Sequence, residues 1–174
     1  HTWNLYDTAT GLSLLWDSRG IEGSISKPQV KFVSTNGTDY LYMLPDNRLD
    51  IINIDENDRT LYSENKAEWF DIYEDESGAW LVYLVRLEES QEQILYREPV
   101  GGGTPEDITP PLSPNEDLDE RFIGHNKFPF VISGDGRYFA ARIYNYPDDE
   151  ARLALVSLQD PSQVTTLLAI DGND

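Results

Sequence analysis

Few residues of this chain have the types and spacing that catalysis requires. His1 and His125 are the only histidines and cysteine is absent, so His125 is the one internal candidate for a general base. No G-x-S-x-G nucleophile elbow occurs, and residues 133–136 read as a turn instead of a strand-to-helix bend. Because His125 lies in a polar loop at 124–127, a solvated histidine is the simpler interpretation. The sequence therefore predicts no catalytic residue and leaves His125 as a candidate for contacting a partner.

Acidic side chains offer oxygen ligands that calcium could use. The best cluster is Asp55, Asn57 and Asp58, but an EF-hand loop begun at Asp55 would need glycine at its sixth position and glutamate at its twelfth. Those two positions hold Thr60 and Lys66 instead. A single loop histidine is also too little for a zinc site. We expect no cofactor, and Asp55, Asn57 and Asp58 remain the residues that calcium would use if it bound.

Tryptophans could stack on a sugar ring or on a peptide. Trp69 and Trp80 fall inside runs that read as strands, where packing in the core is the default for such side chains. Trp16 ends a run beside charged residues, and Trp3 lies across the same predicted hairpin. Trp3 and Trp16 are therefore the aromatic candidates for binding a partner.

The composition limits the classes of partner. The chain has 174 residues, 32 acidic against 13 basic ones, and a formal net charge of −19. Nucleic acids and anionic membrane surfaces both attract basic proteins, so neither is an expected partner. No apolar run approaches the roughly 20 residues that a membrane-spanning helix needs. With 39% hydrophobic residues the chain can build a packed core, and its length suggests a single domain.

The elements that would position these residues are strands. Short runs of β-branched and aromatic residues alternate with turn residues, and no convincing amphipathic helix is present; residues 116–121 are the best helical candidate. Three hairpins are predicted around Asn36-Gly37, Ser77-Gly78 and Asp135-Gly136, with the glycines 41 and 58 residues apart. Asn-Gly favours a type I′ turn, since both central residues need positive φ.

A second hairpin follows each of these three, and one hairpin stands alone at the start of the chain. The sequence thus divides into half a unit at 1–17 and whole four-stranded units at 28–64, 67–110 and 127–170. Antiparallel units of four strands repeated at this spacing are typical of β-propeller blades. We predict an all-β fold, a partial β-propeller of about three and a half four-stranded antiparallel blades.

Four segments carry a resemblance to known propeller families. Residues 94–109, ILYREPVGGGTPEDIT, resemble the third and fourth strands of a TolB-type, WD40-like (PD40-like) propeller blade. Residues 130–140 resemble the run that opens the next blade, with Gly134 where the family usually has proline, and the hairpin at 5–11 has the same style. The second blade, with its charged insertion at 86–93, is similar to blades in the propellers of prolyl-oligopeptidase-like proteins. The resemblance implies a periplasmic or extracellular location.

Three functions stay open at this stage. The first is a non-catalytic interaction module that binds a protein or peptide partner. The second, implied by the resemblance, is the substrate-gating propeller segment of a larger serine peptidase or hydrolase. The third is an extracellular domain that binds carbohydrate or calcium.

An arc of blades that does not close also predicts association. Blade strands are apolar on both faces, as residues 51–52 and 153–156 are, so an open arc would leave an apolar face at each end. We expect the chain to associate with itself or with another chain through these ends, burying on the order of 1,000 Å².

Overall fold

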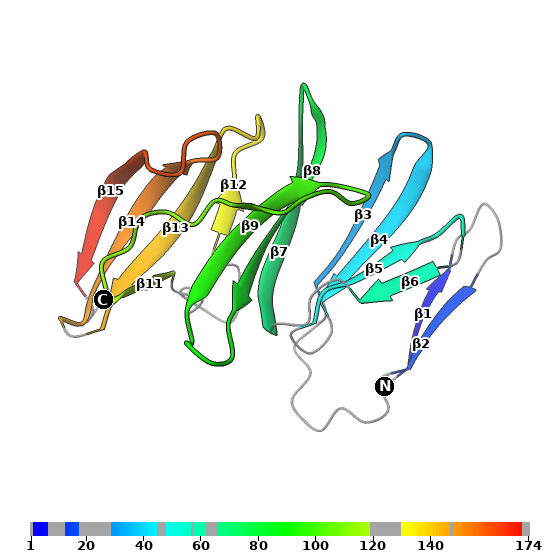
Figure 1. The fold of residues 1–174 in the computed structure, drawn as a ribbon, viewed down its shortest axis with the longest axis horizontal. Helices are drawn as coiled ribbons and strands as arrows, with labels where there is room; N and C mark the ends of the chain where they lie inside the picture. Colours follow the sequence, from blue (N-terminus) through cyan, green and yellow to red (C-terminus); the bar gives the residue numbers. More distant parts are fainter. Residues whose placement is uncertain are drawn as a thin grey trace.

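The protein consists of strands and their connections in the described part of the chain (Figure 1). The computed structural model describes residues 2–6, 13–17, 29–44, 48–56, 58–61, 66–118, 130–146 and 148–171. Within these ranges no helix is long and apolar enough to span a membrane.

The strands form one two-stranded sheet followed by three larger antiparallel sheets. The two-stranded sheet pairs β1 (Thr2–Tyr6) with β2 (Ser13–Asp17). The first large sheet contains β3 (Gln29–Thr35), β4 (Thr38–Leu44), β5 (Asp50–Asn53) and β6 (Asp58–Leu61). The second contains β7 (Lys66–Asp75), β8 (Gly78–Arg86), β9 (Gln93–Pro99) and β10 (Glu106–Asp107). The third contains β12 (Phe130–Ile132), β13 (Tyr138–Asn145), β14 (Glu150–Ser157) and β15 (Val164–Asp171), joined by β11 (Glu116–Leu118).

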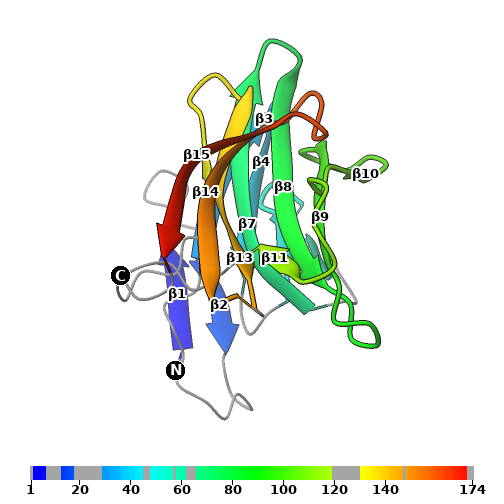
Figure 2. The same cartoon turned by 90° about the vertical axis from the view of Figure 1, so that its left-hand side faces the viewer.

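Strand order identifies the architecture. In the first two large sheets the strands lie in chain order, each antiparallel to the next, and the third repeats this order from β12 to β15. The large sheets stand side by side in Figure 1 and one behind another in Figure 2. This stacking of chain-order meanders is the organisation of propeller blades. The predicted all-β fold and partial propeller are confirmed.

The third sheet contains a strand that the sequence does not indicate. β11 pairs with residues 143–145 of β13, while β12 pairs with residues 139–141 of the same strand. Two short strands therefore share one edge of β13. Residues 116–118, inside the best helical candidate, are extended because this edge supplies hydrogen-bond partners.

The three predicted hairpin turns have three different geometries. Asn36 and Gly37 have φ of 52° and 79°, so both central residues of that turn are left-handed, as a type I′ turn requires. Gly78 lies at the first position of β8 with φ of 135°. Gly136 has φ of 65° and donates its amide to the Ser133 carbonyl at 2.9 Å. Each glycine thus meets a need for positive φ, but at a different place in its turn.

The middle sheet is buried on both faces. One face packs on the first large sheet, where Phe70, Leu81 and Tyr83 meet Val33 and Tyr42. The other face packs on the third sheet. There the rings of Trp69 and Phe130 lie 4.8 Å apart, and Val82 and Leu84 join the same cluster. Sheet-on-sheet contact therefore supplies most of the described core, and apolar side chains make up most of both junctions.

Candidate functional site

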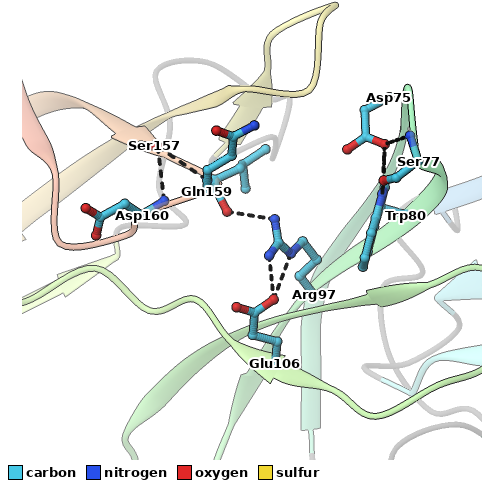
Figure 3. Close-up of polar contacts among 9 residues, drawn as sticks. Asp75, Ser77, Trp80, Arg97, Glu106, Ser157, Gln159 and Asp160 are labelled. Atoms are coloured by element: carbon cyan, nitrogen blue, oxygen red, sulfur yellow. Dashed lines mark hydrogen bonds and ion pairs between the residues drawn. The ribbon is translucent and has the colours of Figure 1, made fainter.

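A polar cluster crosses the junction between the second and third sheets, with Arg97 at its centre (Figure 3). Arg97 Nη1 donates to the Leu158 carbonyl at 2.8 Å, which links β9 to the turn after β14. Its Nε donates to Glu106 Oε2 at 3.2 Å, and its guanidinium lies 5.0 Å from the centre of the Trp80 ring. We call Arg97, Trp80, Glu106 and Leu158 the Arg97 clamp.

Strand register explains why these side chains meet. Glu106 lies directly opposite Arg97 in the β9–β10 pair, so the two side chains project to the same face. Leu95 and Arg97 are two residues apart and also share that face, which packs on the third sheet. Burial lowers the pKa of Arg97, but its interactions with Glu106 and Tyr73 outweigh burial and raise that pKa above its ordinary value. Arg97 therefore stays positively charged.

The β7–β8 hairpin holds Trp80 in place for this stacking. Asp75 Oδ1 accepts the Ser77 amide at 2.8 Å and the Trp80 Nε1 proton at 3.1 Å. Hydrogen bonding from Ser77 holds the pKa of Asp75 below its ordinary value. The indole is thus fixed by an ionised carboxylate at one edge while Arg97 lies over its face.

The turn that presents the Leu158 carbonyl is ordered in a similar way. Ser157 Oγ accepts the amides of Gln159 and Asp160 at 3.3 and 3.2 Å (Figure 3). Asp160 in turn accepts the Ser162 amide at 3.3 Å. The carbonyl that receives Arg97 is therefore part of a hydrogen-bonded turn and not of a free loop end.

The chemistry of the clamp is that of a structural contact. Each polar group is already paired with another group of the clamp or with its own turn, and no side chain is placed as a nucleophile beside a base. In the described ranges no three histidine, aspartate or glutamate side chains come together to hold a metal ion. The clamp can fix the position of the second sheet relative to the third. Its role is therefore to support the surfaces of these two sheets.

The third sheet presents an apolar surface on the side away from the second sheet. Val131 is 66% exposed, Leu168 is 59% exposed and Tyr138 is 38% exposed. Register places Val131 opposite Ala140 and Ala140 opposite Leu155, and it places Leu153 opposite Leu168. We call this surface the open face; its members are Val131, Tyr138, Ala140, Leu153, Leu155 and Leu168.

Charged side chains lie beside the apolar members of the open face. Arg142 lies opposite Leu153 on this face, and its guanidinium is 5.8 Å from the centre of the Tyr144 ring. The Arg137 guanidinium lies 5.7 Å from the centre of the Tyr138 ring. On the opposite face of β14, Ala154 and Val156 are fully buried against the second sheet. The same strands are thus covered on one side and exposed on the other.

The structure brings two of the predicted partner-binding residues together. Trp3 pairs with Trp16 across β1 and β2, so they share one face of that hairpin by register. Their side chains lie outside the described set, and His125 lies outside the described residues altogether. These three candidates stay predictions.

The calcium candidates are described only in part. Asp55 is exposed in the turn after β5, and its Oδ2 accepts the Asp39 amide at 3.0 Å. Asn57 lies outside the described residues, and Asp58 begins β6 with its side chain outside the described set. The one described side chain of the three is thus already hydrogen-bonded to the backbone of β4 in its own sheet.

Sequence reasoning missed the clamp, although a signal was present. In a sheet covered on both sides each strand position is apolar by default, so a charged residue within such a strand stands out. Arg97 and Glu98 are adjacent in β9 and interrupt that pattern on opposite faces. Glu98 is the more unusual of the two, because its side chain is almost fully buried.

Comparisons with known proteins add little at the level of sequence. No protein-family profile matches the chain, and no curated protein matches it. Among solved structures it is similar to TolB from Acinetobacter baumannii, with 14% identity and a TM-score of 0.47, covering 97% of this chain and 38% of that one. It is also similar to a 6-phosphogluconolactonase candidate from Bacteroides uniformis, with 16% identity and a TM-score of 0.44, covering 98% of this chain and 48% of that one.

The chain therefore spans less than half the length of these two proteins. Both TM-scores lie below 0.5. The assignment to a propeller-type fold rests instead on the strand order and on the burial of the middle sheet between its neighbours.

Proposed function

We propose that this chain is a non-catalytic interaction module that binds another protein through the open face of its third sheet. The observation that carries the proposal is the exposure of Val131 and Leu168, 66% and 59%, on a sheet whose other face is fully packed. Contiguous exposed apolar surface of this kind is typical of a protein-binding site.

The packing between the sheets of this protein suggests that its partner also presents a β-sheet. The middle sheet has the same strand order as the third, and it is covered on both faces by neighbouring sheets. A sheet is the shape that fits the pleated surface of another at the roughly 10 Å spacing of packed sheets. A protein that presents an apolar sheet face would therefore extend the existing stack.

A second copy of this chain is such a partner. On the face of the first large sheet turned away from the second, Phe32 is 57% exposed and Val30 is 39% exposed on β3, while Leu41, opposite Phe32, is buried. A head-to-tail contact would cover Phe32 and Val30 of one copy with the open face of the next. Such a heterologous contact leaves free ends and can continue into longer assemblies.

We expect the protein to self-associate, and we expect this association to depend on salt. In size-exclusion chromatography with light scattering, the protein is expected to exceed its monomer mass of 19.8 kDa in a concentration-dependent way. Added salt is expected to increase the mass, because it screens repulsion between chains of charge −19 while leaving apolar contact intact. Val131→Glu and Leu168→Glu are expected to return the protein to a monomer.

Gln159→Glu is the matched control for these variants. It adds the same single charge at an exposed loop position outside the open face, so the mass should stay that of the parent protein. A parent protein that is monomeric at all concentrations and salt levels would overturn self-association. Equal effects of Gln159→Glu and Leu168→Glu would show that charge, and not the open face, controls the assembly.

A further inference from the structure

One carboxyl group lies in the apolar junction between the first and second sheets. Glu98, in β9, is only 1% exposed, and its Oε2 has no hydrogen-bond partner in the described structure. It stands directly opposite Leu81 of β8, whose side chain belongs to the cluster that packs on the first sheet. The carboxyl group is therefore directed into the contact between two sheets and not toward solvent.

The groups around Glu98 are hydroxyls and apolar side chains. Tyr42 of β4, itself buried, interacts electrostatically with Glu98 and accepts the Gly101 amide at its hydroxyl at 3.2 Å. The Tyr40 ring lies 6.4 Å from the Tyr42 ring and packs over Gly101. The first sheet thus closes over Glu98 with two tyrosines and a tight backbone contact.

Among the described side chains no cation forms an ion pair with this carboxyl group. Arg97 projects to the opposite face of β9. Lys31 lies opposite Tyr42 on the β3 face that packs on the second sheet, but it is bound to Asp71 at 2.9 Å. The other titratable residues on the facing surfaces of this junction are tyrosines and two exposed carboxylates: Tyr40 and Tyr42 on β4, Tyr83 on β8, Tyr96 on β9, Glu74 on β7 and Asp107 on β10. None of these neighbours stabilises a negative charge as an ion pair would.

We propose that Glu98 makes the contact between the first and second sheets sensitive to pH, holding them together when it is protonated and loosening them when it ionises. The neutral acid can remain in an apolar contact, whereas the carboxylate must recover water or separate from the surface that buries it. This proposal is independent of binding through the open face, because Glu98 lies between the first and second sheets and the open face belongs to the third sheet.

The direction of the effect follows from the same burial. Burial raises the pKa of Glu98 to about 7 from an ordinary value of 4.5. The folded protein therefore binds this proton more tightly than the unfolded chain, so the contribution of the proton to the stability of the junction is complete below pH 4.5. Stability is lost as the pH rises toward 7, and above 7 the full loss is present.

Hydrogen exchange of backbone amides, corrected for intrinsic rates, measures the loosening of this junction separately for each sheet. We expect the opening equilibrium of β4 and β8 amides to be at least about tenfold larger at pH 8 than at pH 5, since one unit of pKa difference corresponds to a factor of ten. Glu98→Gln, a neutral side chain of the same shape, is expected to remove this pH dependence. Amides of β13 and β14 in the third sheet should respond less.

Two comparisons separate this device from a purely structural role. Glu74→Gln removes an exposed glutamate from β7 of the same sheet and should leave the pH dependence unchanged. If Glu98 is only a packing residue, Glu98→Gln will shift exchange equally at pH 5 and pH 8. That result, or equal protection of β4 at both pH values in the parent protein, would overturn the proposal.

Discussion

Gly136→Ala is expected to destabilise the protein by roughly 2–4 kcal/mol, a large effect for a single methyl group. A Cβ at this position would lie 2.4 and 2.6 Å from the Tyr73 ring carbons Cδ2 and Cε2. Real Cβ atoms do not approach that closely, so either the turn or the Tyr73 ring must move. The Tyr73 ring is buried at the junction between the second and third sheets, which leaves it little room.

Backbone conformation adds to this steric cost. Gly136 has φ of 65°, a left-handed conformation that costs an L-residue roughly 1–2 kcal/mol. The turn between β12 and β13 therefore uses glycine for two reasons at once: its conformation and its contact with the neighbouring sheet.

Two other glycines provide controls that separate these reasons. Gly37 has φ of 79° but nothing within 4 Å of its would-be Cβ, so Gly37→Ala should cost only about 1 kcal/mol. Gly134 has neither a left-handed φ nor a close neighbour, so Gly134→Ala should stay within about 0.5 kcal/mol of the parent. Urea unfolding measures all three free energies. If Gly136→Ala costs no more than Gly37→Ala, the contact with Tyr73 is not tight.

Arg97→Ala is expected to destabilise the protein by about 2–4 kcal/mol. The substitution removes the hydrogen bond to the Leu158 carbonyl, which connects β9 to the third sheet. It also removes the stacking on Trp80 of β8. A charged hydrogen bond contributes about 1.5–3 kcal/mol and an Arg–Trp contact about 0.5–2 kcal/mol. Glu106 contributes little, because it is 56% exposed and water replaces its partner.

Arg97→Lys tests the geometry of the clamp. A lysine keeps the charge but cannot donate to Leu158 and Glu106 from a planar fork, so we expect an intermediate loss of about 1–2 kcal/mol. Arg137→Ala is the matched control, since Arg137 is 61% exposed and its side chain contacts Asp135 and the Tyr138 ring within its own hairpin. That variant should change the free energy of unfolding by less than about 0.5 kcal/mol. If Arg97→Ala and Arg137→Ala lower the free energy of unfolding equally, the clamp does not stabilise the fold.

Local pattern in the sequence was enough to predict the sheets. The turn pair Asn36-Gly37 needs positive φ at both positions, and the alternating runs on either side of it pair as β3 and β4. Strand pairing between chain neighbours depends on residues close together in sequence, so a local pattern carries the information. The short strand β11 was not predicted, because its partner is residues 143–145, far along the chain.

The residues on which the proposals rest could be identified only from contacts between sheets. A period of two divides β9 and β14 into two faces, but it does not indicate what covers each face. Only the packed structure shows that Arg97 and Glu98, neighbours in sequence, enter different junctions. The same is true of β14, where Val156 is buried and Leu155 belongs to the open face.

The sequence by itself determined the all-β fold, the chain-order meanders and the repeat, because each of these follows from turn chemistry and side-chain alternation. The tertiary structure alone decided which sheet faces are covered, where a carboxyl group is desolvated and how closely Gly136 approaches Tyr73. These properties depend on burial and on distances between segments far apart in the chain. Burial sets the cost of an ionised Glu98 and exposure sets the apolar area available to a partner, so both proposed properties of this protein arise at the level of sheet packing.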